Sequence, residues 1–185
     1  GFNADITNCN NLQWLDLSDN EFYHIVYDSP NPDILSQLPN LEYVNFNNNN
    51  IQGEIEPNIG SLQNLSYLRL SYNNFTGEIP ASLGSQTTNL QELYLHSNNL
   101  SGEIPATITE LPMIQNLRLN NNAFYGGFPI IQPGQFSNLN MNGFNLSNNH
   151  LVELDESICN AAATPYLDNN ALCPQFQFDC IEGSY

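Results

Sequence analysis

Aromatic and basic side chains suited to ligand binding recur in this chain at nearly constant intervals. Tyr43 and Tyr67 are 24 residues apart, and Tyr94 lies midway between Arg69 and Arg118, which are the only two basic residues if histidine is counted as neutral. Tyrosine, tryptophan and arginine dominate the binding energy of many protein interfaces. Their regular spacing predicts that a repeating structure brings them onto one surface.

The repeating structure is visible as a nine-residue frame of leucine and asparagine. Its first copy, Leu12 to Asn20, has the pattern LxxLxLxxN, and the apolar alternation with period 2 predicts a short half-buried strand. One turn of this size cannot bury its apolar face alone, so the copies must stack on each other. Six copies are predicted within residues 12–154, with starts at residues 12, 41, 65, 90, 114 and 141.

Asparagine makes up about one residue in six, and the ninth position of every frame is an asparagine. Each predicted strand is followed by a bend, which leaves backbone N–H and C=O groups without partners. An asparagine amide can donate to one kind of group and accept from the other. The asparagine column is therefore predicted to be structural and not to bind a ligand.

A second block follows the frame in several copies, most clearly Phe75-Thr-Gly-Glu-Ile-Pro80 and Leu100-Ser-Gly-Glu-Ile-Pro105. Together the frame and this block resemble the plant-type leucine-rich repeat family, whose extension has the pattern LxGxIP. The resemblance implies a right-handed α/β repeat solenoid with a short-stranded parallel sheet on its concave face. It also implies relatives among receptor ectodomains and polygalacturonase-inhibitor-like proteins.

In this fold the variable positions of the frame lie on the concave sheet. The candidate ligand-binding residues there are aromatic or cationic: Trp14, Tyr43, Tyr67, Arg69, Tyr72, Tyr94, His96 and Arg118. The alternative interpretation is that tyrosine is simply common at exposed strand positions.

Catalysis, cofactors and metals are not expected. Ser71 and His96 share a column in adjacent turns, but no carboxylate is placed to orient the imidazole, and an open sheet implies no oxyanion pocket. Arg69 nearby is expected to disfavour the protonated form of His96. Three stacked glutamates of the LxGEIP block could hold calcium, although a solvated acidic ridge is the preferred interpretation. These glutamates are Glu54, Glu78 and Glu103.

Residues 155–185 depart from the frame and are predicted to form a C-terminal cap with a disulfide. The ending Asn-Asn-Ala-Leu-Cys173 resembles one that closes many plant-type ectodomains, which implies a Cys173–Cys180 bond, with Cys159–Cys173 or Cys159–Cys180 as alternatives. Zinc is a weaker rival. Cys9 would lie about 24 Å from the sixth repeat, beyond the roughly 7 Å that a disulfide allows, so it is expected to be free or intermolecular.

Residues 1–11 are interpreted as the tail of a preceding repeat or as an open N-terminal edge. The chain begins at Gly1 without an initiating methionine or a signal peptide, as expected of a mature or excised fragment. Four glycosylation sequons begin at Asn64, Asn74, Asn99 and Asn145, about as many as chance predicts in so asparagine-rich a chain.

Charge restricts the classes of partner. The net charge of −17 comes from 19 acidic residues against 2 basic ones, with no basic cluster for nucleic acid or anionic lipid. No apolar stretch approaches the ~20 residues of a membrane helix. We therefore expect a non-catalytic extracellular module that binds a protein, peptide or glycan. The alternative is a filament, adhesion or ice-binding protein that assembles with a neighbouring chain through its N-terminal edge.

Overall fold

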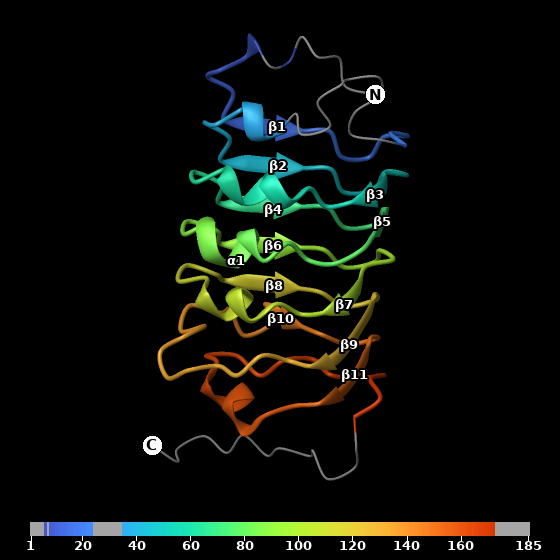
Figure 1. Ribbon diagram of the computed structural model, residues 1–185, viewed down its shortest axis with the longest axis vertical. Helices are drawn as coiled ribbons and strands as arrows, with labels where there is room; N and C mark the ends of the chain where they lie inside the picture. The colour runs from blue at the N-terminus through green and yellow to red at the C-terminus, as the bar shows by residue number, and fades with distance from the viewer. Residues whose placement is uncertain (1–5, 7, 24–34, 173–185) are drawn as a thin grey trace.

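The computed structural model describes residue 6, residues 8–23 and residues 35–172. These residues form a column of stacked turns, and each turn adds one short strand to a parallel sheet (Figure 1). The arrangement confirms the predicted solenoid. This six-stranded inner sheet has the order β1 (Trp14–Asp16), β2 (Tyr43–Asn45), β4 (Tyr67–Arg69), β6 (Glu92–Tyr94), β8 (Asn116–Arg118) and β10 (Phe144–Asn145).

The LxGxIP blocks form two further parallel sheets along one flank (Figure 1). Gly77 and Gly102 in these blocks have φ angles of 77° and 87°, which a side chain would strain. The first small sheet pairs β3 (Gln52–Glu54) with β5 (Asn74–Thr76). The second, here called the outer sheet, has the order β7 (Ser101–Glu103), β9 (Ala123–Gly127) and β11 (His150–Glu153).

Short helical turns return the chain from each outer block to the next inner strand. Most are single 3-10 turns of three to five residues. They are η2 (Leu35–Gln37), η3 (Pro57–Ser61), α1 (Ser82–Gln86), η4 (Ala106–Glu110) and η5 (Glu156–Asn160).

The core is a stack of leucines from equivalent frame positions. Leu68, Leu93 and Leu117 are fully buried and lie in register on successive strands. Near the C-terminal end the leucines are joined by an aromatic cluster in which the ring of Phe144 lies 5.3 Å from Phe128 and 5.7 Å from Phe136.

The ninth-position asparagines form a continuous ladder, as predicted. Asn73 is typical: its Oδ1 accepts a hydrogen bond from the Ile51 amide at 3.0 Å, and its Nδ2 donates to the carbonyls of Phe46 and Leu70 at 2.8 and 3.2 Å. Each rung therefore satisfies backbone groups of its own turn and of the preceding one. The same pattern is made by Asn49, Asn98, Asn122, Asn149 and Asn170.

A second asparagine ladder, not predicted, runs along the position just before each frame. There the Nδ2 group donates to a carbonyl of the preceding turn, at distances of 2.6 to 3.2 Å for Asn40, Asn64, Asn89 and Asn138. Met113 takes the equivalent place in the fifth turn and has no donor to offer. Within the described residues this second ladder therefore lacks a rung in the fifth turn, where the carbonyl equivalent to those of Gln63 and Pro112 is that of Thr88.

Replacing Met113 with asparagine is expected to raise the free energy of unfolding by about 0.5–1 kcal/mol, because it adds one hydrogen bond at an exposed site. Met113 is already 45% exposed, so little apolar burial is lost. Urea denaturation measures the change, and Met113→Asp is the control, since aspartate has the same shape without the donor. If Met113→Asn and Met113→Asp had equal free energies of unfolding, the added hydrogen bond could not be the cause of the stabilisation.

The start of the sixth repeat is corrected from Met141 to Leu139. Met141 is 85% exposed, whereas Leu139 is 5% exposed and packs in the core. Asn138 and Asn140 make the inter-turn bonds typical of the positions flanking a frame start. The sequence Met141-Asn142 is thus a two-residue insertion that fits the frame pattern without entering the core.

The ladder continues beyond residue 154, into the range assigned to the cap. Asn170 occupies a ladder position, and Tyr166 forms a parallel bridge with Asn145. Cys159 is disulfide-bonded, whereas Cys173 and Cys180 lie outside the described residues. This favours the alternatives that include Cys159 over a Cys173–Cys180 pair; its partner stays a prediction.

Candidate functional site

Aromatic rings cover the N-terminal end of the concave face. Trp14 and Tyr43 stack with their ring centroids 3.6 Å apart and an interplanar angle of 5°. Trp14 remains 62% exposed, but Tyr43 is only 6% exposed. The expectation that Tyr43 contacts a ligand directly is therefore corrected: its ring supports Trp14, and Trp14 presents the open surface.

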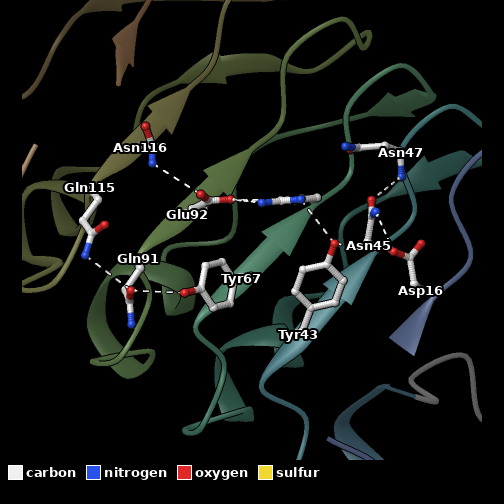
Figure 2. A network of polar contacts seen from close by, with 10 residues as sticks. Asp16, Tyr43, Asn45, Asn47, Tyr67, Gln91, Glu92, Gln115 and Asn116 are labelled. Atoms are coloured by element: carbon white, nitrogen blue, oxygen red, sulfur yellow. Dashed lines mark hydrogen bonds and ion pairs between the residues drawn. The ribbon is translucent and has the colours of Figure 1, made fainter. Parts of the chain in front are cut away.

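Arg69 is held by hydrogen bonds to Glu92 and Tyr43, both of which are labelled in Figure 2. Its Nε and Nη2 donate to Oε2 of Glu92 at 2.9 and 2.5 Å, and its Nη1 donates to the hydroxyl of Tyr43 at 3.2 Å. Burial would lower the Arg69 pKa, but the hydrogen bond and charge of Glu92 outweigh it and raise the pKa. Arg69 is thus neutralised within the protein.

Arg118 differs from Arg69 in having no carboxylate partner among the described residues. Its guanidinium carbon lies 5.0 Å from the centroid of the Tyr94 ring, and that of Arg69 lies 5.3 Å from the same ring. The only ion pair within the described residues is the one between Arg69 and Glu92. Arg118 is therefore the one arginine with charge available to an outside anion.

Asp16 and Glu92 are site residues that the sequence analysis missed. Asp16 accepts hydrogen bonds from the Ser18 amide at 3.0 Å and from Asn45 Nδ2 at 3.1 Å. Burial would raise the pKa of Asp16, yet these bonds hold it below its usual value. Figure 2 shows Asp16, Asn45 and Glu92 in one polar network along the sheet. The sequence did carry a signal for both residues. In the stacked frames Glu92 lies one turn after Arg69, and Asp16 lies one turn before Asn45, so each carboxylate is close to a suitable donor.

Tyr72 is an exposed aromatic residue in a left-handed backbone conformation. Its φ is 55°, and its ring meets His96 edge to face with centroids 5.0 Å apart. The equivalent residue of every other described turn is aspartate, asparagine or serine with nearly the same φ. A bulky side chain in this region is strained, and such strain often marks functional positions.

The serine and histidine considered for catalysis do not form a catalytic pair. Ser71 is fully buried, and its Oγ has no hydrogen-bond partner in the described part of the chain. Burial and, secondarily, the charge of Arg118 lower the pKa of His96 to about 4. Arg118, and not Arg69 as expected, is therefore the cation that disfavours protonation of this imidazole.

Stability is expected to fall between about pH 6.5 and pH 4 because of His96. In this window the unfolded chain binds a proton at the imidazole, while the folded chain does not until its pKa of about 4 is reached. Because the ring is partly exposed, we expect the free energy of unfolding to fall by only about 1 kcal/mol across this window. Urea denaturation across this range should show that His96→Gln loses less stability than the wild type. If the free energies of unfolding of His96→Gln and the wild type fell in parallel with pH, the lowered pKa of His96 would be contradicted.

The four sequons differ in their surroundings. Asn74 and Asn99 are exposed as expected, but Asn74 lies at the start of β5 and not on a bend, and Asn99 lies shortly before β7. Asn64 is exposed and forms a rung of the second ladder. Asn145 lies half-buried on β10, where its Oδ1 accepts from the Ser147 amide at 3.0 Å. Which of them carry glycans stays a prediction. Cys9 is exposed and has a free thiol.

Stacked parallel strands, the asparagine ladder and a concave face with variable polar residues define the leucine-rich repeat class. Leucine-rich repeat models match residues 11–38, 39–85 and 63–124. The structure of a pollen receptor kinase 3 is 31% identical, with a TM-score of 0.67, over 82% of this chain and 73% of that one. The chain belongs to the leucine-rich repeat family and resembles plant receptor ectodomains.

Two other solved structures are similar over most of this chain. The Arabidopsis receptor kinase HAESA, in complex with the peptide hormone IDA and the co-receptor SERK1, is 30% identical over 92% of this chain, with a TM-score of 0.79. A plant ice-binding protein is 29% identical over 85% of this chain and 49% of its own, with a TM-score of 0.72. No curated protein matches the sequence.

The chain spans 23% to 28% of the length of the first three receptor structures that it matches. Within the described residues, no helix combines the length and the apolar character that crossing a bilayer requires. The same residues contain no cluster of three side chains suited to hold a metal ion.

Proposed function

We propose that the protein is a non-catalytic, extracellular recognition module that binds a peptide or protein ligand on its concave sheet. One observation carries the proposal: exposed aromatic rings and an arginine without a carboxylate partner share this face. The receptor kinase HAESA, a relative by structure, was solved with a peptide hormone. Trp14, Tyr67, Tyr72 and His96 would supply contact area.

Arg118 is the proposed anchor for an acidic group of the ligand, since Arg69 is already occupied by Glu92. Tyr94 would hold Arg118 in place, because the tyrosine ring faces the guanidinium. Arg69 and Tyr43 would support this arrangement from beneath without direct contact to the ligand.

The experiment that tests this function is a selection from a displayed library of random peptides, followed by affinity measurements on variants. Arg118→Ala and Tyr94→Ala are each expected to weaken the selected peptides at least 10-fold, about 1.4 kcal/mol. Tyr23→Ala is the matched control: this tyrosine is also exposed, lies beside β3 on the flank, and should leave affinity unchanged. Peptides that bind all four proteins equally would contradict the concave face as the site.

A second candidate function is ice binding, which the similarity to a plant ice-binding protein favours. Polar side chains bond between turns along one edge of the concave face, as in Asn48 to Asp19 at 2.9 Å and Asn169 to Asn148 at 2.6 Å. Tyr72 interrupts this row. Absence of thermal hysteresis at millimolar concentration would exclude the candidate, whereas its presence together with an empty peptide selection would favour it.

A further inference from the structure

A groove lies along the outer sheet, on a different sheet from the proposed ligand-binding face. It has a volume of about 510 Å³ and is lined by residues of β7 and β9, of the segments that follow them, and by Glu78 from the segment after β5. Tyr125 is 51% exposed beside it, and Pro105 and Pro129 form apolar parts of its wall. Figure 1 shows β7, β9 and β11 together on the flank of the column.

Two carboxylates, those of Glu78 and Glu103, line the groove. A Cβ atom at Gly102 would lie only 2.6 Å from Cγ of Glu78, and one at Gly126 would lie 3.2 Å from Cγ of Glu103. The absence of side chains at these glycines lets each glutamate lie flat over the next turn. Both glutamates are exposed and line the groove from successive turns.

The protein does not neutralise these carboxylates itself. The chain has no lysine, and both arginines, Arg69 and Arg118, belong to the inner sheet. No ion pair to Glu78 or Glu103 is present within the described residues. With a net charge of −17, a counter-charge for the groove has to come from outside the chain.

Tyr125 adds a second type of contact for a cation. It is the register partner of Glu103 on the neighbouring strand, so ring and carboxylate lie side by side. An aromatic face attracts cations, and a carboxylate accepts charge-assisted hydrogen bonds from them. His150 is the register partner of Tyr125 on β11.

We propose that this groove is a docking site for an arginine side chain in a segment of a partner protein. A planar guanidinium can stack on Tyr125 while it donates to Glu78 and Glu103, which the compact ammonium of lysine cannot do as well. The prolines of the wall would pack against the methylene groups of the arginine. The chain would thus have two recognition surfaces, one for an anionic group and one for a cationic group.

The test is an NMR titration of the isotope-labelled chain at pH 7.5 and low salt with the peptide acetyl-Gly-Ser-Arg-Ser-Gly-amide. Saturable shifts are expected at the amides of Gly102, Tyr125 and Gly127. Glu78→Gln with Glu103→Gln should weaken binding at least about 5-fold, and so should Tyr125→Ala. The matched control removes the same charge elsewhere, by Glu21→Gln with Glu110→Gln, and should change affinity less than about 2-fold.

Two matched peptides complete the design. Citrulline in place of arginine keeps the shape without the charge, and lysine keeps the charge without the planar group. Weaker binding of both is the expected result. The proposal is overturned if shifts do not saturate, if both double variants weaken binding equally, or if citrulline or lysine binds as well as arginine. Arg118→Ala should not affect this titration, which separates its outcome from that of the proposed function.

Discussion

Replacement of Asn73 by alanine is expected to lower the free energy of unfolding by about 3–5 kcal/mol. The side chain is buried, accepts from the Ile51 amide at 3.0 Å and donates to the Phe46 carbonyl at 2.8 Å. Alanine would leave the buried Ile51 amide without its partner, at a cost of about 1–3 kcal/mol. It would also remove about 1 kcal/mol for each hydrogen bond to the carbonyls of Phe46 and Leu70, which keep Asn49 and Asn98 as donors. Urea denaturation followed by circular dichroism measures the loss.

Asn99→Ala is the matched control for this prediction. Asn99 is also an asparagine on the bend, but it is exposed and lies one position after the ladder. Its replacement should change the free energy of unfolding by less than about 0.5 kcal/mol. If Asn73→Ala cost no more than Asn99→Ala, the ladder would be a consequence of the fold and not one of its main stabilising features.

Replacement of Phe144 by alanine is expected to cost about 3–5 kcal/mol, because it opens a cavity in the aromatic cluster. The residue is fully buried, and its ring contacts Phe128 and Phe136 edge to face at interplanar angles of 63° and 79°. Phe144→Leu keeps most of the volume and should cost about 1.5 kcal/mol or less.

The location of the aromatic cluster adds a spatial test of the Phe144→Ala prediction. Turns of a solenoid contact only their neighbours, so the damage from Phe144→Ala should remain near the C-terminal end. Hydrogen exchange should show lost protection at the amides of Leu146 and Leu151, while that of Leu68 keeps its protection. Uniform loss along the chain would show that the column unfolds as one unit, which would contradict local damage.

The periodic part of the fold was predictable because each turn solves the same physical problem. Alternating leucines require a half-buried strand, and a bend after each strand requires a side chain that both donates and accepts. Leu93 and Asn98 meet these two requirements, and the structure places them as expected. The family followed from the same residues.

Contacts between side chains at different positions of the frame were not predictable, because they depend on which rotamer each long side chain adopts. Glu92 could have pointed to solvent, yet it neutralises Arg69 and leaves Arg118 as the available cation. Tyr43 looked like a surface contact but is covered by Trp14. Met141 fits the repeat pattern as well as Leu139 does, and only burial distinguishes them.

The asparagine ladder also has a mechanical consequence. Its rungs join successive turns in series, so a force that pulls the two ends of the column apart would load each rung separately. Between Leu41 and Leu139 the chain should then lengthen in steps of one turn, each releasing 24 or 25 residues and about 80–90 Å of extended chain. The second ladder adds a further bond between most turns but lacks one at Met113, so the fifth turn is the expected place for the first step within the column.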